Sequence, residues 1–263
     1  MKLLLAAIKR VQKTVVRTRR QCRLSSRANS GLAPHRGEAL ISGSSWELVQ
    51  RLGTQVEVRA AFITEEEEGA LLRELEPGLR KKRYEFDHWD DAIHGYRETE
   101  RVSWGAPCEE ILQRVRSLAF PEGSPLLGPV HVLDLDKTGY IKPHIDSVKV
   151  GFWRFLSLFL CSRMVKRLVC GICCHIISLI FQFCGSTIAG LCLLSDSIMR
   201  LVKEDCSKEW LDLLLPRRSL YILRDEARYN FTHEILKDEE SVFNGQKVPR
   251  HRRISVICRN LPS

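Results

Sequence analysis

Short hydrophobic or alternating runs dominate the chain from residue 130 onward, and polar turn-forming residues separate them. The runs cover residues 130–136, 140–146, 186–195, 198–202, 210–215, 219–224, 229–236 and 252–259. Gly, Pro, Asp, Ser and Lys lie between them, which is typical of short strands joined by turns. Many short strands of this kind predict a β-sandwich or jelly roll.

Two helices are predicted ahead of these strands. The first begins after Thr64, because Thr64 can cap a helix and Glu67, three residues later, can complete a capping box. Pro77 is expected to end this helix. A second amphipathic helix is expected over residues 107–120, with apolar positions at Ile111, Leu112, Val115, Leu118 and Ala119. Two such helices would cover one sheet of a mainly β, α+β domain.

Charge divides the chain near its N-terminus. Apolar residues make up 44% and charged residues 28%, which predicts a packed core rather than disorder. Residues 1–37 contain ten Lys or Arg and no acid, whereas the remaining 31 basic and 32 acidic residues nearly balance. The net charge of +9 therefore belongs to the N-terminal segment and does not indicate a basic domain for nucleic acid or membrane.

We interpret the basic segment as a mitochondrial presequence, because it is rich in Arg and Ser and lacks acids. It is not a secretory signal, since its apolar start, LLLAAI, is short and basic residues follow at once. The alternative is a disordered basic arm that binds RNA or acidic lipid. We place the presequence and a linker at residues 1–55 and a single domain at 56–263. The ten cysteines of such an intracellular chain are expected to be reduced thiols.

Residues 150–182 do not fit the strand pattern. Of these 33 residues, 22 are apolar, four are basic and none is acidic. We interpret this atypical insertion as a retained intron translated in frame, since every Val codon begins with GT, one Gln codon ends with AG, and the segment runs from Val to Gln. A membrane anchor interrupted by basic residues and a soft-metal site at CGICCH are the alternative interpretations.

Candidate metal ligands lie in two of the predicted strands. His144 and Asp146 are two residues apart in a strand, so their side chains point to the same face. Taken alone, such a pair is usually structural. His233 lies in a later strand, and a histidine from a facing strand would complete a 2-His-1-carboxylate triad. That ligand set leaves coordination positions open and suits non-haem Fe(II).

A cationic clamp is predicted in the last strand. Arg253 and Arg259 are six residues apart and share a face, and an Arg fork binds a carboxylate in two places. Tyr221, on a neighbouring strand, can add a hydroxyl donor. Two neutral imidazoles and one carboxylate leave Fe(II) with one net positive charge, which attracts an anionic chelator. Each residue singly is more often a core or surface residue, so only the combination predicts a site.

Taken in this order, H-x-D, the distal His of HEI and R-x5-R resemble the AlkB-type Fe(II)/2-oxoglutarate dioxygenases. The resemblance covers about residues 60–260 without 150–182, and is greatest to a mitochondrial member of the family. It rests on the segments RELEPGLRKKRYEFDHWDDAIHGYRETE, HVLDLDKTGYIKPHIDSVK, ARYNFTHEILKDEE and RRISVICR. It implies a double-stranded β-helix, a cupin-like jelly roll with N-terminal helices packed on one sheet.

The resemblance also implies a site and a reaction. Fe(II) would be held by His144, Asp146 and His233. The cosubstrate 2-oxoglutarate would lie near Arg253, Arg259 and Tyr221, and O2 would be consumed. The implied activity is oxidation of a protein side chain or a small metabolite in the mitochondrial matrix, with roles in programmed necrosis after alkylation damage and in fatty-acid metabolism.

Nucleic acid is a weaker candidate substrate. Relatives that repair nucleobases carry Asn-x-Tyr where this chain has Leu133 and Leu135. Without residues 1–37 and 150–182 the chain has 27 basic and 32 acidic residues, whereas binding a phosphate backbone needs clustered cations. DNA is therefore not expected as a partner, and demethylation of mitochondrial RNA is the alternative activity. A catalytically dead or misfolded product of the insertion is a further alternative. We expect no firm membrane span and a monomer.

Overall fold

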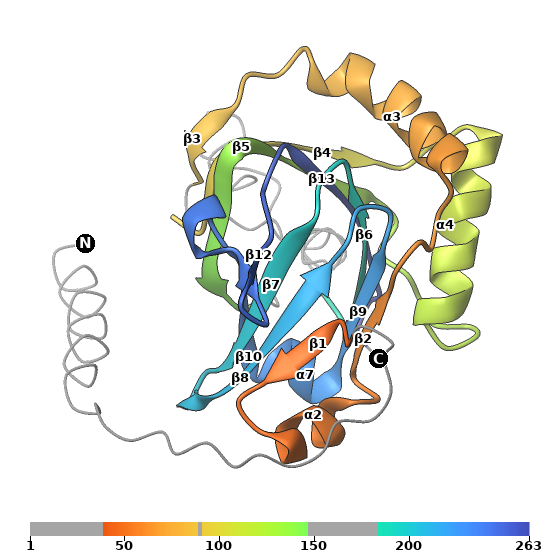
Figure 1. The fold of residues 1–263 in the computed structure, drawn as a ribbon. Coiled ribbons are helices and arrows are strands. Elements are labelled where there is room, and N and C mark those ends of the chain that lie inside the picture. The colour runs from red at the N-terminus through yellow and green to blue at the C-terminus, as the bar shows by residue number, and fades with distance from the viewer. Residues whose placement is uncertain (1–38, 89–90, 147–183, 263) are drawn as a thin grey trace, which may run out of the picture. The chain divides into compact units, whose positions relative to one another are not determined.

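The computed structural model describes residues 39–88, 91–146 and 184–262, which belong to the compact unit Ala39–Ser263 (Figure 1). The described helices are α2 (Trp46–Leu52), α3 (Glu65–Leu79), α4 (Ala106–Ala119), α7 (Asp225–Tyr229) and the 3-10 turn η2 (Asp238–Glu240). The described strands are β1 (Ile41–Gly43), β2 (Val56–Arg59), β3 (Glu85–Asp87), β4 (Ile93–Arg101), β5 (Val130–His144), β6 (Thr187–Leu193), β7 (Ser197–Lys203), β8 (Cys206–Leu215), β9 (Leu220–Arg224), β10 (Phe231–Ile235), β11 (Val242–Phe243), β12 (Gln246–Lys247) and β13 (Arg253–Arg259).

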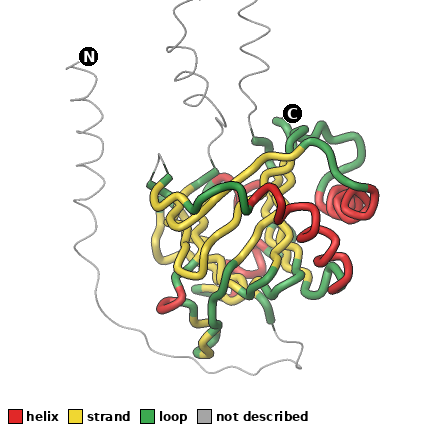
Figure 2. Tube along the Cα trace, turned by 90° about the horizontal axis from the view of Figure 1, so that it is seen from above, coloured by secondary structure: helices red, strands yellow, loops and turns green. Residues whose placement is uncertain are grey.

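Eleven of the described strands form one antiparallel sheet that rolls into a nearly closed barrel (Figures 1 and 2). Its order is β1-β8-β7-β10-β5-β13-β6-β9-β2, with β4 on the side of β5 and β3 beyond it. The long strand β5 joins the two halves, because residues 131–135 pair with β13 while His144 pairs with His233 of β10. This is the strand order of a double-stranded β-helix, and the predicted fold class is confirmed.

The predicted strands are also confirmed, with one change. The runs 130–136 and 140–146 are a single strand, β5, which ends at His144. The strand passes Gly139, where an added Cβ would lie 2.5 Å from the carbonyl oxygen of Gly95 in β4. Gly95 itself has φ +61°, in the left-handed region. The two glycines therefore allow β4 and β5 to stay paired across an irregularity in their register.

Both predicted helices are present and cover the outside of one half of the barrel (Figures 1 and 2). The capping box of Thr64 and Glu67 is formed. Pro77 does not end α3 as predicted, because the helix continues to Leu79. Leu79 is fully buried with Leu75, one turn earlier, and this burial outweighs the hydrogen bond that Pro77 cannot donate. The helices thus share a core with the outward face of β6, β9 and β13.

A second hydrophobic core fills the barrel interior. It is formed by the other faces of the same strands together with β7, β8 and β10. Along β13 the two faces alternate, so Ile254, Val256 and Cys258 face the helices. Arg253 and Arg259 therefore point into the barrel, where they line its cavity.

The folded unit begins earlier than the predicted boundary at residue 56. The segment 39–55, which the sequence interpretation assigned to a linker, forms β1 and α2. β1 extends the sheet beside β8, and α2 buries Leu48 and Leu52 in the barrel core. The sequence of these short elements shows no regular alternation of apolar and polar residues. They form because β1 pairs with β8 and α2 packs on the barrel core. The predicted presequence up to residue 38 and the segment 150–182 lie outside the described residues, and no helix of the described part is long and apolar enough to span a membrane.

A buried ionic network fixes β13 against its neighbours. Asp134 of β5 is fully buried and accepts from Arg97 Nε at 2.7 Å and from Arg252 Nη2 at 2.8 Å. Tyr84 adds a hydroxyl donor at 3.2 Å. Arg252, the residue before β13, also donates to Glu76 of α3 at 2.5 Å, so the network links β4, β5 and the start of β13 to a helix.

Replacing Asp134 by Ala should therefore destabilise the fold. The substitution leaves Arg97 and Arg252 with their main acceptor missing, and breaking a buried pair in this way costs about 3–5 kcal/mol. Urea unfolding should show a lower midpoint at an unchanged slope. Arg80→Ala is the control, because it removes only an exposed pair with Glu76 and should change the free energy of unfolding by less than about 0.5 kcal/mol. Equal stability of Asp134→Ala and the wild type would contradict this account.

Candidate metal and cosubstrate centre

Three potential metal ligands converge where β5 and β10 meet. His144 and His233 are direct cross-strand partners, and their ring centroids are 4.2 Å apart. Asp146 follows two residues after His144, and its Oδ1 lies 3.4 Å from Nε2 of each histidine. The ligand atoms all lie within 4.8 Å of one another. The structure therefore brings together the three residues that the sequence predicted as a triad.

The surroundings of Asp146 and His233 favour the protonation states that bind a metal. Burial opposes the ionisation of Asp146, but the Arg259 guanidinium and the two histidines outweigh it, and the pKa of Asp146 lies well below its ordinary value. Burial, assisted by His144, lowers the pKa of His233. A carboxylate and a neutral imidazole are the forms that bind a divalent cation. Two histidines and one carboxylate on one side also leave further coordination positions free, as non-haem Fe(II) requires.

Arg259 lies against Asp146. Its Nε and Nη2 donate to Asp146 Oδ2 at 3.0 and 2.8 Å, so Oδ1 remains directed at the histidines. Burial works against the charge of Arg259, but Asp146 more than compensates, and the pKa of Arg259 is raised. The sequence interpretation paired Arg259 with Arg253 around the cosubstrate. The structure instead gives Arg259 a carboxylate of the protein, and its contact with a cosubstrate stays a prediction.

Arg253 is a buried guanidinium without an anionic partner among the described residues. Its side chain is 1% exposed, and Nη2 makes its one described hydrogen bond, to Cys192 Sγ at 3.4 Å. No described group accepts from its Nε. Ser255, two residues along on the same face, also has a buried Oγ without a described partner. A buried cation and a buried hydroxyl in this condition cost free energy unless a ligand supplies acceptors, so this pair fits an anion such as a carboxylate.

A narrow cavity of about 90 Å³ connects the triad with Arg253. Tyr221 lines it, and burial raises the pKa of this phenol, so the hydroxyl stays protonated and can donate. Leu133 is also in the wall and adds no polar group there. Two polar lining residues, Ser255 and His131, were missed in the sequence interpretation. The sequence did offer a signal: Ser255 is two residues from Arg253 and His131 is two residues from Leu133, so each shares a strand face with a lining residue. The remaining described lining residues are Ile93, Ile141, Ile188, Met199, Leu223, Ile235 and Ile257.

Asp87, Asp91 and His94 are the other described group with closely spaced ligand atoms. The two carboxylates are exposed, and Asp91 already pairs with Lys142 Nζ at 2.8 Å. His94 Nδ1 lies 2.7 Å from Asp87 Oδ1. Because these charges are met by the protein itself, we assign no metal site there.

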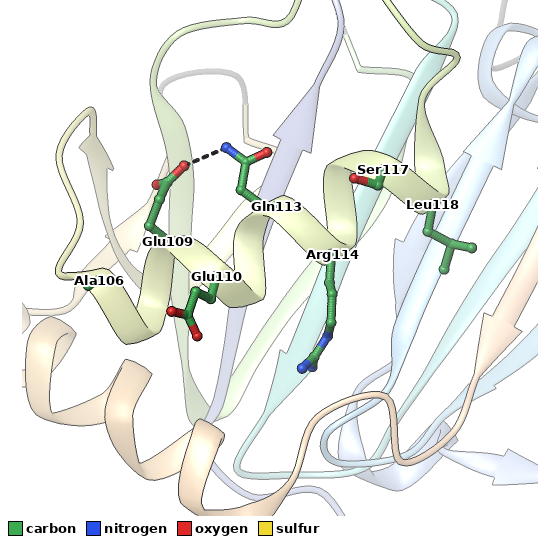
Figure 3. A pocket seen from close by; sticks show the side chains of 7 residues that line it. All are labelled: Ala106, Glu109, Glu110, Gln113, Arg114, Ser117 and Leu118. Carbon is green, nitrogen blue, oxygen red and sulfur yellow. Dashed lines mark hydrogen bonds between the residues drawn. The ribbon is translucent and has the colours of Figure 1, made fainter.

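A larger hollow of about 680 Å³ lies along α4 (Figure 3). Its described lining residues all come from that helix, and Glu109 and Gln113 within it are hydrogen-bonded at 2.9 Å. It contains none of the candidate site residues, so the candidate chemistry belongs to the barrel cavity. The lining residues are Ala106, Glu109, Glu110, Gln113, Arg114, Ser117 and Leu118.

Because Arg253 has no anionic partner among the described residues, its replacement should have a distinctive effect on stability. Arg253→Met should leave the ligand-free protein as stable as the wild type or stabilise it by about 1–4 kcal/mol, because it removes a buried charge without an anionic partner. The wild type should gain about 2.7 kcal/mol from 2-oxoglutarate at 100 times its dissociation constant, and the variant should gain none. Thermal unfolding with and without 2-oxoglutarate measures both effects.

The neighbouring residue provides the matched control. Arg252→Met removes a guanidinium that is bound to Asp134, so it should lower stability and keep the response to 2-oxoglutarate. The account of Arg253 would be wrong if its Met variant lost several kcal/mol of stability and 2-oxoglutarate still stabilised it.

Comparison with known proteins identifies the family. No family model matches the chain. It is 51% identical over 226 residues to "Alpha-ketoglutarate-dependent dioxygenase alkB homolog 7, mitochondrial" of Mus musculus, covering 86% of this chain and 87% of that protein. The Bos taurus protein of the same name is 50% identical over 222 residues, covering 84% and 86%. The solved structure of OsALKBH1 is similar with a TM-score of 0.48 and 11% identity, over 78% of this chain and 97% of that chain. The resemblance inferred from the sequence is confirmed, and the chain belongs to the alkB homolog 7 family of alpha-ketoglutarate-dependent dioxygenases.

Proposed function

We propose that this chain is an Fe(II)- and 2-oxoglutarate-dependent dioxygenase of mitochondria. His144, Asp146 and His233 would hold Fe(II). The observation that supports this most strongly is the shared cavity. It is lined by the candidate metal-ligand triad and by the buried guanidinium of Arg253, which has no anionic partner in the described part of the chain. The mouse and bovine relatives are named as mitochondrial alpha-ketoglutarate-dependent dioxygenases, in agreement with this assignment.

Different residues of the cavity would bind the metal and the cosubstrate. When bound, Fe(II) supplies the redox chemistry that couples decarboxylation of 2-oxoglutarate by O2 to oxidation of a substrate C–H bond. With two neutral imidazoles and one carboxylate around it, bound Fe(II) would keep one net positive charge, which would attract the oxo-acid end of the cosubstrate. Arg253 would hold the distal carboxylate in a forked contact, with the Tyr221 hydroxyl and Ser255 as added donors. The apolar wall excludes water and strengthens these electrostatic contacts.

A protein side chain or a small metabolite is the proposed substrate. Leu133 and Leu135 are both buried and offer no polar group. The excess of acidic over basic residues in the chain without residues 1–37 and 150–182 also disfavours a phosphate backbone. We place the activity in the mitochondrial matrix, in agreement with the Arg-rich segment 1–37. Roles in programmed necrosis after alkylation damage and in fatty-acid metabolism are part of this proposal.

Demethylation of mitochondrial RNA is the second candidate function. It is distinguished by charge, because the logarithm of an affinity that depends on neutralising phosphates falls linearly with the logarithm of salt concentration. A salt-dependent affinity of the full chain for RNA would favour it. A lack of measurable RNA affinity at low salt would leave the protein or metabolite substrate.

Turnover of the cosubstrate tests the proposed function. With Fe(II), ascorbate and air, the full chain should convert 2-oxoglutarate to succinate. Asp146→Asn should lower the rate more than about 100-fold, because loss of an outer-shell partner alone costs 10–100-fold. Asp136→Asn is the control, since Asp136 lies in β5, the strand that leads to Asp146, but is not among the described lining residues of the cavity. No succinate from either the full chain or the chain without residues 150–182, or an undiminished rate in Asp146→Asn, would contradict the proposal.

The deletion of residues 150–182 separates an inactive product from a wrong assignment. If the shorter chain makes succinate and the full chain does not, the insertion makes this product catalytically dead. If both make succinate at similar rates, the insertion is compatible with activity.

A further inference from the structure

One nitrogen of Arg259 does not contact Asp146. While Nε and Nη2 bind Asp146 Oδ2, Nη1 lies 3.4 Å from Nδ1 of His131. On its other side the His131 ring places Nε2 3.0 Å from Glu98 Oε2. A continuous line of contacts thus runs from Glu98 through His131 and Arg259 to Asp146.

The strand registers explain why these side chains meet. Glu98 is opposite Leu133 and is therefore a diagonal neighbour of His131, two residues away on β5. His131 is opposite Ile257 on β13, which makes Arg259 its diagonal neighbour on the other side. Three adjacent strands, β4, β5 and β13, each contribute one residue of the line. His131 and Arg259 both line the cavity.

The hydrogen-bonding capacity of each side chain determines which group donates in each contact. A guanidinium can only donate, so Nδ1 of His131 must be the acceptor for Arg259. The proton of a neutral imidazole then lies on Nε2, where it donates to the Glu98 carboxylate. Glu98 therefore selects the tautomer that presents a lone pair to Arg259. The arrangement is the one by which outer residues orient a metal ligand.

We propose that His131 is a positioning residue for the metal centre, held by Glu98 and acting through Arg259 on Asp146. A guanidinium is planar and rigid, so fixing Nη1 fixes the plane in which Nε and Nη2 meet Asp146 Oδ2. Oδ1 is thereby kept toward His144 and His233. This inference rests on the proposed function, because it assumes that Asp146 is a metal ligand.

Substitutions that mimic one half of the imidazole test this role. The amide of Asn reaches about as far as Nδ1 and can still accept from Arg259, whereas Gln reaches toward Glu98 and leaves the Nδ1 position empty. Leu removes both contacts. Co(II), as the metal alone, is titrated by calorimetry into the metal-free full-length protein and its variants, with unfolding temperatures recorded to confirm that each is folded.

His131→Leu and His131→Gln should bind Co(II) about 3- to 10-fold more weakly than wild type, less than the 10–100-fold typical of residues that touch a ligand directly. His131→Asn should stay within about twofold, since it keeps the acceptor for Arg259. His94→Asn is the matched control, because His94 is a β4 histidine bonded to Asp87 and away from Arg259. It should leave the Co(II) affinity unchanged even where it lowers stability.

A double variant separates positioning from a general packing defect. If His131 acts through Arg259, adding His131→Leu to Arg259→Gln should change the Co(II) affinity by less than about twofold, because coupled residues are not additive. Full additivity would overturn the inference, as would equal affinity of His131→Gln and His131→Asn. If the wild-type chain binds no Co(II), the proposed metal site fails and the inference fails with it. Tight binding by wild type that His131→Leu leaves unchanged overturns only the inference.

Discussion

The pleat of β13 is the constraint on which the site depends. Alternate residues of a strand face opposite sides, and in β13 one side packs under α3 and α4 while the other faces the barrel interior. Ile254 and Val256, both fully buried, hold the strand in the core between helices and sheet. That burial fixes the register, and a slip of one residue would turn every side chain to the wrong face. Arg253, Ser255 and Arg259 are carried into the barrel by the same register.

The barrel interior is a costly place for the charges of Arg253 and Arg259, because burial removes them from water. The carboxylate of Asp146 balances the charge of Arg259, and its other oxygen lies close to both histidines. Arg253 has no anionic partner within residues 39–88, 91–146 and 184–262. Burial and the charge of Arg253 lower the pKa of the nearby Arg250 to about 10. Functional sites often store destabilisation of this kind, which a bound ligand relieves. The two hydrophobic cores supply stability that offsets the cost of the buried Arg253 charge in the barrel.

Much of this architecture could be predicted from the sequence, because it follows from local periodicity. The two-residue period predicted the strands, and the same period put His144 and Asp146 on one face. The capping box located the start of α3. Other features needed information from distant parts of the chain. The folding of residues 39–55 depends on the edge of β8, and the end of α3 beyond Pro77 depends on the burial of Leu79.

The candidate site shows the same division between local and distant information. The choice of His233 required a facing strand; its place in a later predicted strand suggested it, and the family resemblance then supported it. The contact of Arg259 with Asp146 joins two distant segments of the chain, and spacing along one strand does not encode it. His131 was overlooked because its role depends on Glu98 and Arg259, which lie on neighbouring strands. Ser255 was overlooked although it shares a strand face with Arg253. Sequence patterns therefore predict which residues can share a face, and the sheet register decides which of them touch.

The most direct test of the account is an anaerobic titration of the full chain with Fe(II) and 2-oxoglutarate. It follows the visible absorption band that arises when 2-oxoglutarate chelates protein-bound Fe(II). The account predicts a band in the wild type that is lost in His144→Ala. The same measurement on the chain without residues 150–182 shows whether the insertion prevents assembly of the site. A band that persists in His144→Ala, or no band from either wild-type chain length, would contradict the central claim.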